Sequence, residues 1–92
     1  WTQARHGLDV TTVILANRSY AILNLELSRV GVEQPGPVAL SMLDLTHPDL
    51  DFCSVARGLG VPAERPTDAE GLTAAIERAI AEPGPHLIEC IM

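Results

Sequence analysis

An uncharged run of apolar and β-branched residues at 10–16 constrains the fold of this chain more than any other feature of its sequence. A parallel strand that is covered on both faces needs no alternation of polar and apolar residues, and this run fits such a strand. A second run, at 86–92, predicts another strand. Helical patterns lie between the two, and strands that alternate with helices form parallel sheets. We therefore expect an α/β fold, a three-layer parallel sheet with right-handed βαβ crossovers.

Helical patterns flank the first predicted strand. The chain begins with the tail of a helix at 1–6, which is expected to end at Gly7 because glycine suits the left-handed turn after a helix. After a polar turn, apolar residues recur on roughly helical spacing over 20–30, and Gly31 closes this segment. These apolar positions are too many for a narrow stripe, so we expect part of the helix to face another chain or domain.

Residues 31–48 are expected to form a long connection without regular structure, because their prolines fix φ and remove hydrogen-bond donors. Long loops of this kind tend to be lids or binding segments. Asp49 can then cap a helix that runs to about Leu59 and ends at Gly60. Residues 61–64 predict a short edge strand at best, since the proline among them cannot donate to a ladder.

The clearest helix signal begins with a predicted capping box at 67–70, in which the Thr67 hydroxyl and the Glu70 carboxylate each satisfy a free backbone N–H. Apolar residues then repeat on one helical face, namely Leu72, Ala75, Ile76, Ala79 and Ile80. The Pro-Gly-Pro turn at 83–85 halts this helix and leads into the last predicted strand.

The charge of the chain limits the partners that it can bind, and its cysteines indicate the compartment in which it functions. The formal net charge is −6 and the six basic residues are scattered, which argues against nucleic acid and anionic membranes, because both select for clustered Lys and Arg. No apolar run approaches the roughly 20 residues that a membrane span needs. Cys53 and Cys90 have no paired spacing, so we expect two reduced, buried thiols in a cytoplasmic protein.

One predicted strand end carries groups that suit a ligand. In open parallel sheets, ligands lie beyond the carboxyl ends of the strands, and the segment 16–20 is rich in polar groups at such an end. Taken alone, the pattern is weak, because Asn and Ser are common turn formers. The triplet at 17–19 also matches a glycosylation acceptor. A plain turn therefore stays open as the alternative to a binding segment.

Two longer stretches of the sequence, one of which includes this strand end, resemble motifs of a known family. The segment LANRSYAIL at 15–23 follows a helix tail, a Gly-Leu turn and a predicted buried strand. It resembles the end of the cofactor motif of thiamine-diphosphate enzymes, which begins with Gly-Asp-Gly and closes with Asn-Asn. The second Asn of that pair aligns with Asn17, and the first is Ala16 here. The stretch 43–90, which contains PDLDF and GPHLIE, is similar to relatives of acetolactate synthase and benzoylformate decarboxylase.

The resemblance implies that residues 1–92 are the C-terminal portion of a thiamine-diphosphate-binding domain, on its pyrophosphate side, with the N-terminal part missing. It also implies that the Asn17 side-chain oxygen and the Ser19 backbone carbonyl ligate Mg²⁺, which ties the cofactor's diphosphate to the protein. Oxygen donors are the ligands that Mg²⁺ takes. The residues expected to line the cofactor or reaction pocket, which would equally suit a packed helix start, are Tyr20, Ile22 and Leu23.

The resemblance implies an activity for the whole protein and none for this chain alone. The negatively charged metal ligand of the family is the Asp of Gly-Asp-Gly, which this sequence lacks, so no catalytic residue is assigned within it. The whole protein is expected to decarboxylate a 2-oxo acid as an acetolactate-synthase-like enzyme, to ligate or protonate the resulting carbanion, and to form a homodimer or homotetramer. The alternatives are a benzoylformate-type decarboxylase, an enzyme split between two polypeptides, and a non-catalytic α/β binding module.

The remaining polar side chains are interpreted as structural. His47 lies in the proline-rich connection, where a solvated histidine is the expected state. Glu64 and Glu89 have no carboxylate mate in the sequence, so an acid–base pair cannot be argued from them. The aspartates of 44–51 lack the glycine and terminal glutamate of a calcium loop.

Overall fold

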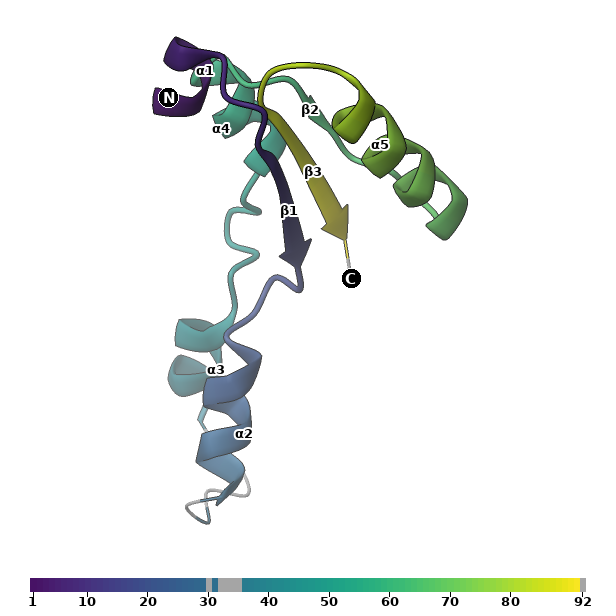
Figure 1. The fold of residues 1–92 in the computed structure, drawn as a ribbon. Coiled ribbons are helices and arrows are strands. Elements are labelled where there is room, and N and C mark those ends of the chain that lie inside the picture. Colours follow the sequence, from purple (N-terminus) through teal and green to yellow (C-terminus); the bar gives the residue numbers. More distant parts are fainter. Residues whose placement is uncertain (30, 32–35, 92) are drawn as a thin grey trace. The chain divides into compact units, whose positions relative to one another are not determined.

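The computed structural model of the chain describes residues 1–29, 31 and 36–91 (Figure 1). The chain forms two compact units, one of residues 1–16 and 51–92 and the other of residues 17–50. The first unit contains the sheet, and the second begins directly after the predicted strand end. None of the described helices combines the length and the apolar character that a membrane crossing requires.

The sheet of the first unit has three parallel strands in the order β1-β3-β2. Strand β1 is Thr11–Ala16, β2 is Ala63–Glu64 and β3 is His86–Ile91. Strand β1 pairs with β3 along its whole length. Strand β2 is short, and the carbonyl of Pro62 just before it accepts a hydrogen bond from the Leu87 N–H at 2.9 Å. The two predicted strands and the short edge strand are therefore confirmed.

Helices cover both faces of this sheet. Helices α4 (Phe52–Gly58) and α5 (Ala69–Ala81) lie on opposite sides of β3 (Figure 1). Because successive side chains of a strand point to opposite faces, neighbouring residues of β3 meet different helices. Ile88 is buried against α5. The Glu89 carboxylate accepts a hydrogen bond from the N–H of Phe52, the first residue of α4, at 3.1 Å. The predicted three-layer α/β arrangement is confirmed.

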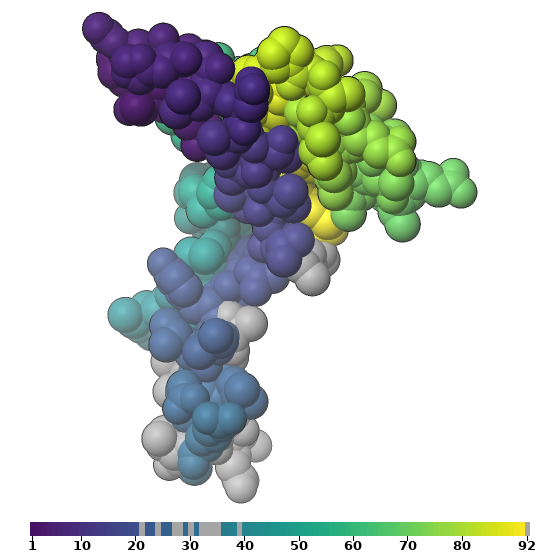
Figure 2. All heavy atoms as spheres, viewed as in Figure 1, coloured from purple at the N-terminus to yellow at the C-terminus, as the bar shows by residue number. Residues whose placement is uncertain are grey.

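Strand β1 is less covered than its sequence predicts. Val13 is 41% exposed and Leu15 is 63% exposed, whereas Ala16 is buried. The space-filling view shows β1 at the surface of the first unit (Figure 2). In the described sheet β1 is an edge strand, and the central position belongs to β3. The expectation of a strand covered on both faces is therefore wrong for β1 in this chain.

Helix α5 begins one residue later than the predicted capping box requires. Asp68 is the N-cap, and its carboxylate accepts a hydrogen bond from the Gly71 N–H at 2.6 Å. The prediction at 67–70 placed the cap on the threonine, and it is wrong because aspartate is an equally good cap. The apolar face is confirmed at Ala75, which is buried, but Ile80 is 73% exposed and lies off that face.

Helix α4 is also capped by a different residue from the one expected. The Asp51 carboxylate, rather than that of Asp49, accepts hydrogen bonds from the Ser54 N–H at 3.0 Å and the Ser54 hydroxyl at 2.7 Å. The N–H of the next residue, Phe52, is bound by Glu89 from β3. This contact fixes where the helix starts, and it cannot be read from the local sequence.

Two predicted helix ends are confirmed by their glycines. Helix α1 (Thr2–His6) ends at Gly7, which has a φ of 59°. Gly60, which follows α4, has a φ of 86°. Only glycine adopts this left-handed region without strain, so the sequence marks both ends reliably.

The second unit contains helices α2 (Ala21–Arg29) and α3 (Pro37–Leu43). Helix α2 confirms the helix predicted at 20–30, whose last residue lies outside the described residues. Helix α3 contradicts the prediction of an irregular connection over 31–48, of which 32–35 lie outside the described residues. The proline at 37 stands in the first turn of α3, where its missing N–H costs nothing and its fixed φ suits a helix. Proline here starts a helix.

Apolar side chains of the second unit are exposed. Those of α2 are Ile22, Leu23 and Leu25, and those of α3 are Val38, Leu40 and Met42. A helix pair with this surface is expected to contact other protein, since large exposed apolar patches mark interaction sites. The contact between this helix and another chain or domain stays a prediction.

Candidate functional site

The predicted site begins with the turn that follows β1. The Asn17 side-chain carbonyl accepts a hydrogen bond from the Ser19 N–H at 3.3 Å. Arg18, between them, has a φ of 59°, a left-handed conformation that turns the chain sharply. The amide of Asn17 thus supports the turn, as the plain-turn reading expects. An amide oxygen has two acceptor positions, so this bond does not exclude a metal ion.

A second segment of the same unit holds the turn in place. Ser19 and Asp44 form an isolated antiparallel bridge. On either side of it, the Tyr20 N–H donates to the Leu43 carbonyl at 2.9 Å, and the Leu45 N–H donates to the Arg18 carbonyl at 2.9 Å. The backbone of 18–20 is therefore held by 43–45, a segment that begins at the last residue of α3.

All the residues predicted to bind the cofactor lie around one pocket of about 240 Å³. Its lining residues are Asn17, Ser19, Tyr20, Ile22 and Leu23. The lining combines polar groups of the turn with apolar side chains from the start of α2. Small-molecule sites commonly combine a few placed polar groups with an apolar wall. The roles of these residues stay predictions.

The donor set of this turn suits part of a magnesium site. Asn17 offers an amide oxygen and Ser19 offers a main-chain carbonyl, and both are the hard, neutral oxygen donors that Mg²⁺ accepts. The two residues lie two positions apart, and a hydrogen bond joins them in one short turn. The residues therefore fit two ligands of an ion whose remaining ligands, including any carboxylate, come from elsewhere.

The first unit contains a charged cluster that sequence reasoning missed. Glu89 is 1% exposed, and its carboxylate accepts hydrogen bonds from the Arg65 guanidinium and the Phe52 N–H. Arg65 also donates to the Asp51 carboxylate at 2.6 Å. The Cys53 thiol lies 3.9 Å from Glu89. Arg65 and Glu89 lie far from residues 51–53 in the sequence, so no local pattern predicts the cluster.

The cluster is a structural ion network. Three of its side chains, those of Asp51, Cys53 and Glu89, lie close enough to hold a metal ion. The guanidinium of Arg65, however, already binds both carboxylates, and the bond to Glu89 raises the pKa of Arg65 above its usual value. Burial, together with the Glu89 carboxylate, raises the pKa of the Cys53 thiol, which disfavours the thiolate that metals bind.

None of the other polar candidates is among the described residues that line the predicted pocket. His47 is highly exposed, as expected, with its Nε2 3.7 Å from Asp44 Oδ2. His86 Nε2 lies 3.3 Å from Glu82 Oε2. Glu64 pairs with Arg78 at 2.5 Å. Both cysteines are free thiols, as predicted, and Cys90 is only partly buried.

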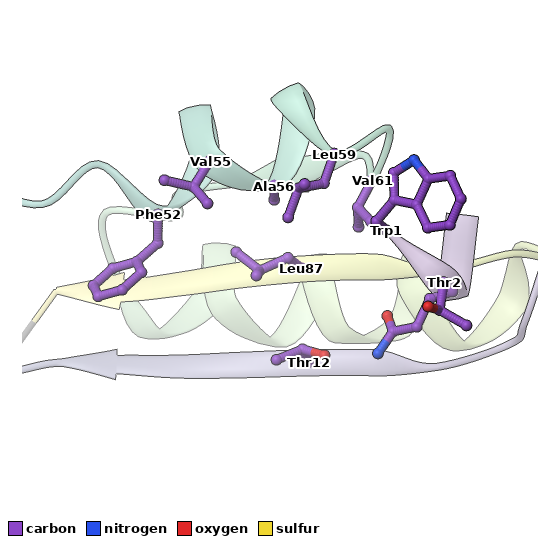
Figure 3. Close-up of a pocket in the computed structure, with 10 residues that line it drawn as sticks. Trp1, Thr2, Thr12, Phe52, Val55, Ala56, Leu59, Val61 and Leu87 are labelled. Carbon is purple, nitrogen blue, oxygen red and sulfur yellow. The ribbon is translucent and has the colours of Figure 1, made fainter. Parts of the chain in front are cut away.

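A larger pocket of the first unit offers little chemistry. It measures about 330 Å³ and lies beside Trp1, between α4 and the sheet (Figure 3). Val55 of α4, Leu59 at the C-terminal end of that helix and Leu87 of β3 line it (Figure 3). None of the described residues that line it has a charged side chain. We interpret it as incomplete packing between α4 and the sheet.

The fold and the strand-end turn together define a parallel α/β unit with an oxygen-donor segment after one strand. The sequence matches the thiamine pyrophosphate enzyme C-terminal TPP binding domain over residues 1–90. The chain therefore belongs to the thiamine pyrophosphate enzyme family, as part of its C-terminal TPP-binding domain, and the resemblance seen in the sequence is confirmed.

Three similar proteins show the breadth of this family. A putative acetolactate synthase large subunit from Mycobacterium tuberculosis is 53% identical over 93 residues, covering 100% of this chain and 18% of that protein. A benzoylformate decarboxylase from Pseudomonas aeruginosa is 36% identical over 90 residues, covering 97% and 16%. The structure of a thiamine diphosphate-dependent 4-hydroxybenzoylformate decarboxylase from Rhodococcus jostii has a TM-score of 0.82 at 30% identity, covering 97% and 16%. The chain thus spans less than a fifth of these relatives.

Proposed function

We propose that this chain forms the metal side of a thiamine-diphosphate site in a longer enzyme that decarboxylates a 2-oxo acid. The observation that carries the proposal is the pocket in the second unit, which gathers Asn17, Ser19, Tyr20 and Ile22 directly after a parallel strand. Ligands of open parallel sheets lie at such strand ends. The family match over residues 1–90 supports thiamine diphosphate as the ligand.

Each residue of the pocket has its own task in this proposal. Asn17 and Ser19 supply two oxygen ligands to Mg²⁺, and the ion neutralises the diphosphate of the cofactor. Tyr20 and Ile22 form the apolar part of the lining, against which the bound molecule packs. When bound, thiamine diphosphate supplies the means to stabilise a carbanion, whereas the chain supplies orientation and shielding.

The proposed site is incomplete within these 92 residues. Two neutral donors leave the charge of Mg²⁺ uncompensated by protein, so the full protein supplies a carboxylate to the same ion. The isolated chain is therefore inactive in this proposal. The full protein is proposed to be a cytoplasmic homodimer or homotetramer, in keeping with the exposed apolar surface of α2 and α3.

The reaction we favour is that of an acetolactate-synthase-like carboligase, in which the decarboxylated fragment joins a second carbonyl compound. The identity of 53% with a putative acetolactate synthase subunit exceeds the 36% with a benzoylformate decarboxylase, and this difference favours carboligation. The second candidate is decarboxylation followed by protonation to an aldehyde. The likeness in structure to a 4-hydroxybenzoylformate decarboxylase supports that alternative.

The test is an activity assay of the full-length protein with thiamine diphosphate, Mg²⁺ and either pyruvate or benzoylformate. The proposal expects release of CO₂ from a 2-oxo acid that stops when the metal is chelated and resumes when Mg²⁺ is restored. Mass analysis separates the two candidates, because a carboligation product contains carbon from two substrates and an aldehyde contains carbon from one. A full-length protein that binds no thiamine diphosphate would instead favour a non-catalytic α/β module.

A further inference from the structure

The Ser19 carbonyl depends on its surroundings in a way that a side-chain ligand does not. A side chain can reach a metal ion by changing rotamer, but a main-chain carbonyl points wherever the planar backbone holds it. Besides the bond from the Ser19 N–H to Asn17, two backbone hydrogen bonds hold this segment on either side of Ser19, one from Tyr20 to Leu43 and one from Leu45 to Arg18. Residues 43–45 therefore contribute to the direction of the Ser19 carbonyl.

The side chain of Asp44 in turn shapes the segment 43–45. Its Oδ1 accepts hydrogen bonds from the Thr46 N–H at 2.9 Å and from the Thr46 hydroxyl at 2.6 Å. The Thr46 hydroxyl is the main cause that lowers the pKa of Asp44 below its usual value, so both bonds favour the ionised carboxylate. The backbone of Thr46 also forms an isolated antiparallel bridge with that of Asp49. The Asp44 side chain therefore stabilises the backbone turn next to the Leu43 carbonyl and the Leu45 N–H, the two groups that bond to residues 18–20.

We propose that Asp44 is a positioning residue for the metal segment: through Thr46 it holds the backbone that aims the Ser19 carbonyl. The inference rests on the proposed function, because Ser19 is a ligand only if the site binds Mg²⁺. Asp44 touches neither the ion nor the cofactor in this account. Its two bonds to Thr46 occupy Oδ1, and its Oδ2 lies 3.7 Å from His47 Nε2.

Two substitutions separate positioning from direct ligation. Asp44→Asn keeps an oxygen that accepts both bonds from Thr46 and removes only the charge. Asp44→Ala removes both bonds. In the full-length protein, saturated with thiamine diphosphate, we expect Asp44→Ala to weaken Mg²⁺ binding about 10- to 100-fold, the usual range for groups that orient a metal ligand. We expect Asp44→Asn to stay within about threefold of wild type, since it keeps the orienting bonds.

Thr46→Val provides a second variant should Asp44→Ala fail to fold. It removes the hydroxyl donor, keeps the N–H donor and changes the side-chain volume little, so an intermediate loss of Mg²⁺ affinity is expected. Glu26→Ala is the matched control. It removes the same charge from the same unit, and its carboxylate accepts a hydrogen bond at 3.1 Å from Arg29 of its own helix. Its Mg²⁺ affinity should equal that of wild type.

Titration calorimetry with Mg²⁺, well below the unfolding temperature of every variant, gives distinct results. If Asp44→Asn is as weak as Asp44→Ala, the carboxylate itself is needed and the positioning role is overturned. If Asp44→Ala binds like wild type, or Glu26→Ala falls as far as Asp44→Ala, the inference is also overturned. A wild-type protein that binds neither Mg²⁺ nor thiamine diphosphate refutes the proposed function, and the inference falls with it.

Discussion

The buried Glu89 carboxylate is expected to be the strongest single contact between α4 and the sheet. It accepts hydrogen bonds from the Phe52 N–H and from Arg65, and it is 1% exposed. A hydrogen bond to a charged group contributes about 1.5–3 kcal/mol, and truncating a buried side chain adds a cavity. Glu89→Ala should therefore destabilise the α4–β3 junction by about 3–4 kcal/mol.

The kind of substitution matters as much as the position. Glu89→Gln keeps an oxygen for the Phe52 N–H and leaves the partly exposed Arg65 to be hydrated, so it should cost only about 1–2 kcal/mol. Arg65→Ala is expected to be worse than Glu89→Gln, because it leaves a buried carboxylate without its cation. The double variant Arg65→Ala/Glu89→Gln should then be more stable than Arg65→Ala alone, since it removes the uncompensated charge.

Hydrogen exchange followed by mass spectrometry on the full-length protein measures this junction locally. Peptides from α4 should exchange at least about 100-fold faster in Glu89→Ala and about tenfold faster in Glu89→Gln, since each 1.4 kcal/mol corresponds to tenfold. Peptides from α5, on the other face of the sheet, serve as the internal reference. The account would be contradicted if the α4 peptides of the double variant exchange faster than those of Arg65→Ala alone. That result would show that the uncompensated charge of buried Glu89 is not what destabilises Arg65→Ala.

Three further outcomes follow from the first unit. Asp68→Ala should cost about 1 kcal/mol of α5 stability, whereas Thr67→Ala should be nearly neutral; exchange of α5 peptides compares them. Cys53 should react with iodoacetamide at neutral pH far more slowly than a free exposed thiol, because burial raises its pKa. The Ser54 hydroxyl and N–H lower the pKa of Asp51 below 3.8. The stabilisation of α4 by Asp51 should therefore be complete above pH 3.8 and lost as the pH falls through the lowered pKa. Circular dichroism of wild type and Asp51→Asn measures this loss.

The elements that could be predicted from the sequence are those whose pattern is set by the backbone itself. The uncharged run of β1 and the repeat of α5 match strand and helix, because burial of one apolar face suffices to select each. Gly7 and Gly60 mark helix ends because the left-handed conformation is theirs almost alone. The five residues that line the candidate pocket were predicted through the family resemblance, and the structure places them around one cavity.

The cap of α4 and the buried ion pair could not be predicted from the sequence, because both depend on contacts between distant residues. Both Asp49 and Asp51 could serve as the N-cap of α4. The choice between them follows from Glu89 of β3, which accepts a hydrogen bond from the first N–H of the helix. The pairing of Glu89 with Arg65 likewise joins separate elements. The prolines of 31–48 suggested a loop, because proline serves a loop and the first turn of a helix equally well.

The most direct measurement of the central claim is Mg²⁺ binding to the full-length protein in saturating thiamine diphosphate, wild type against Asn17→Ala. The account predicts that Asn17→Ala lowers the affinity for Mg²⁺ at least about tenfold, because one oxygen ligand and the turn bond to Ser19 are lost together. The unfolding temperature without ligand should change little, since Asn17 is exposed. Equal Mg²⁺ affinity in the two proteins would contradict the assignment of this turn to the metal.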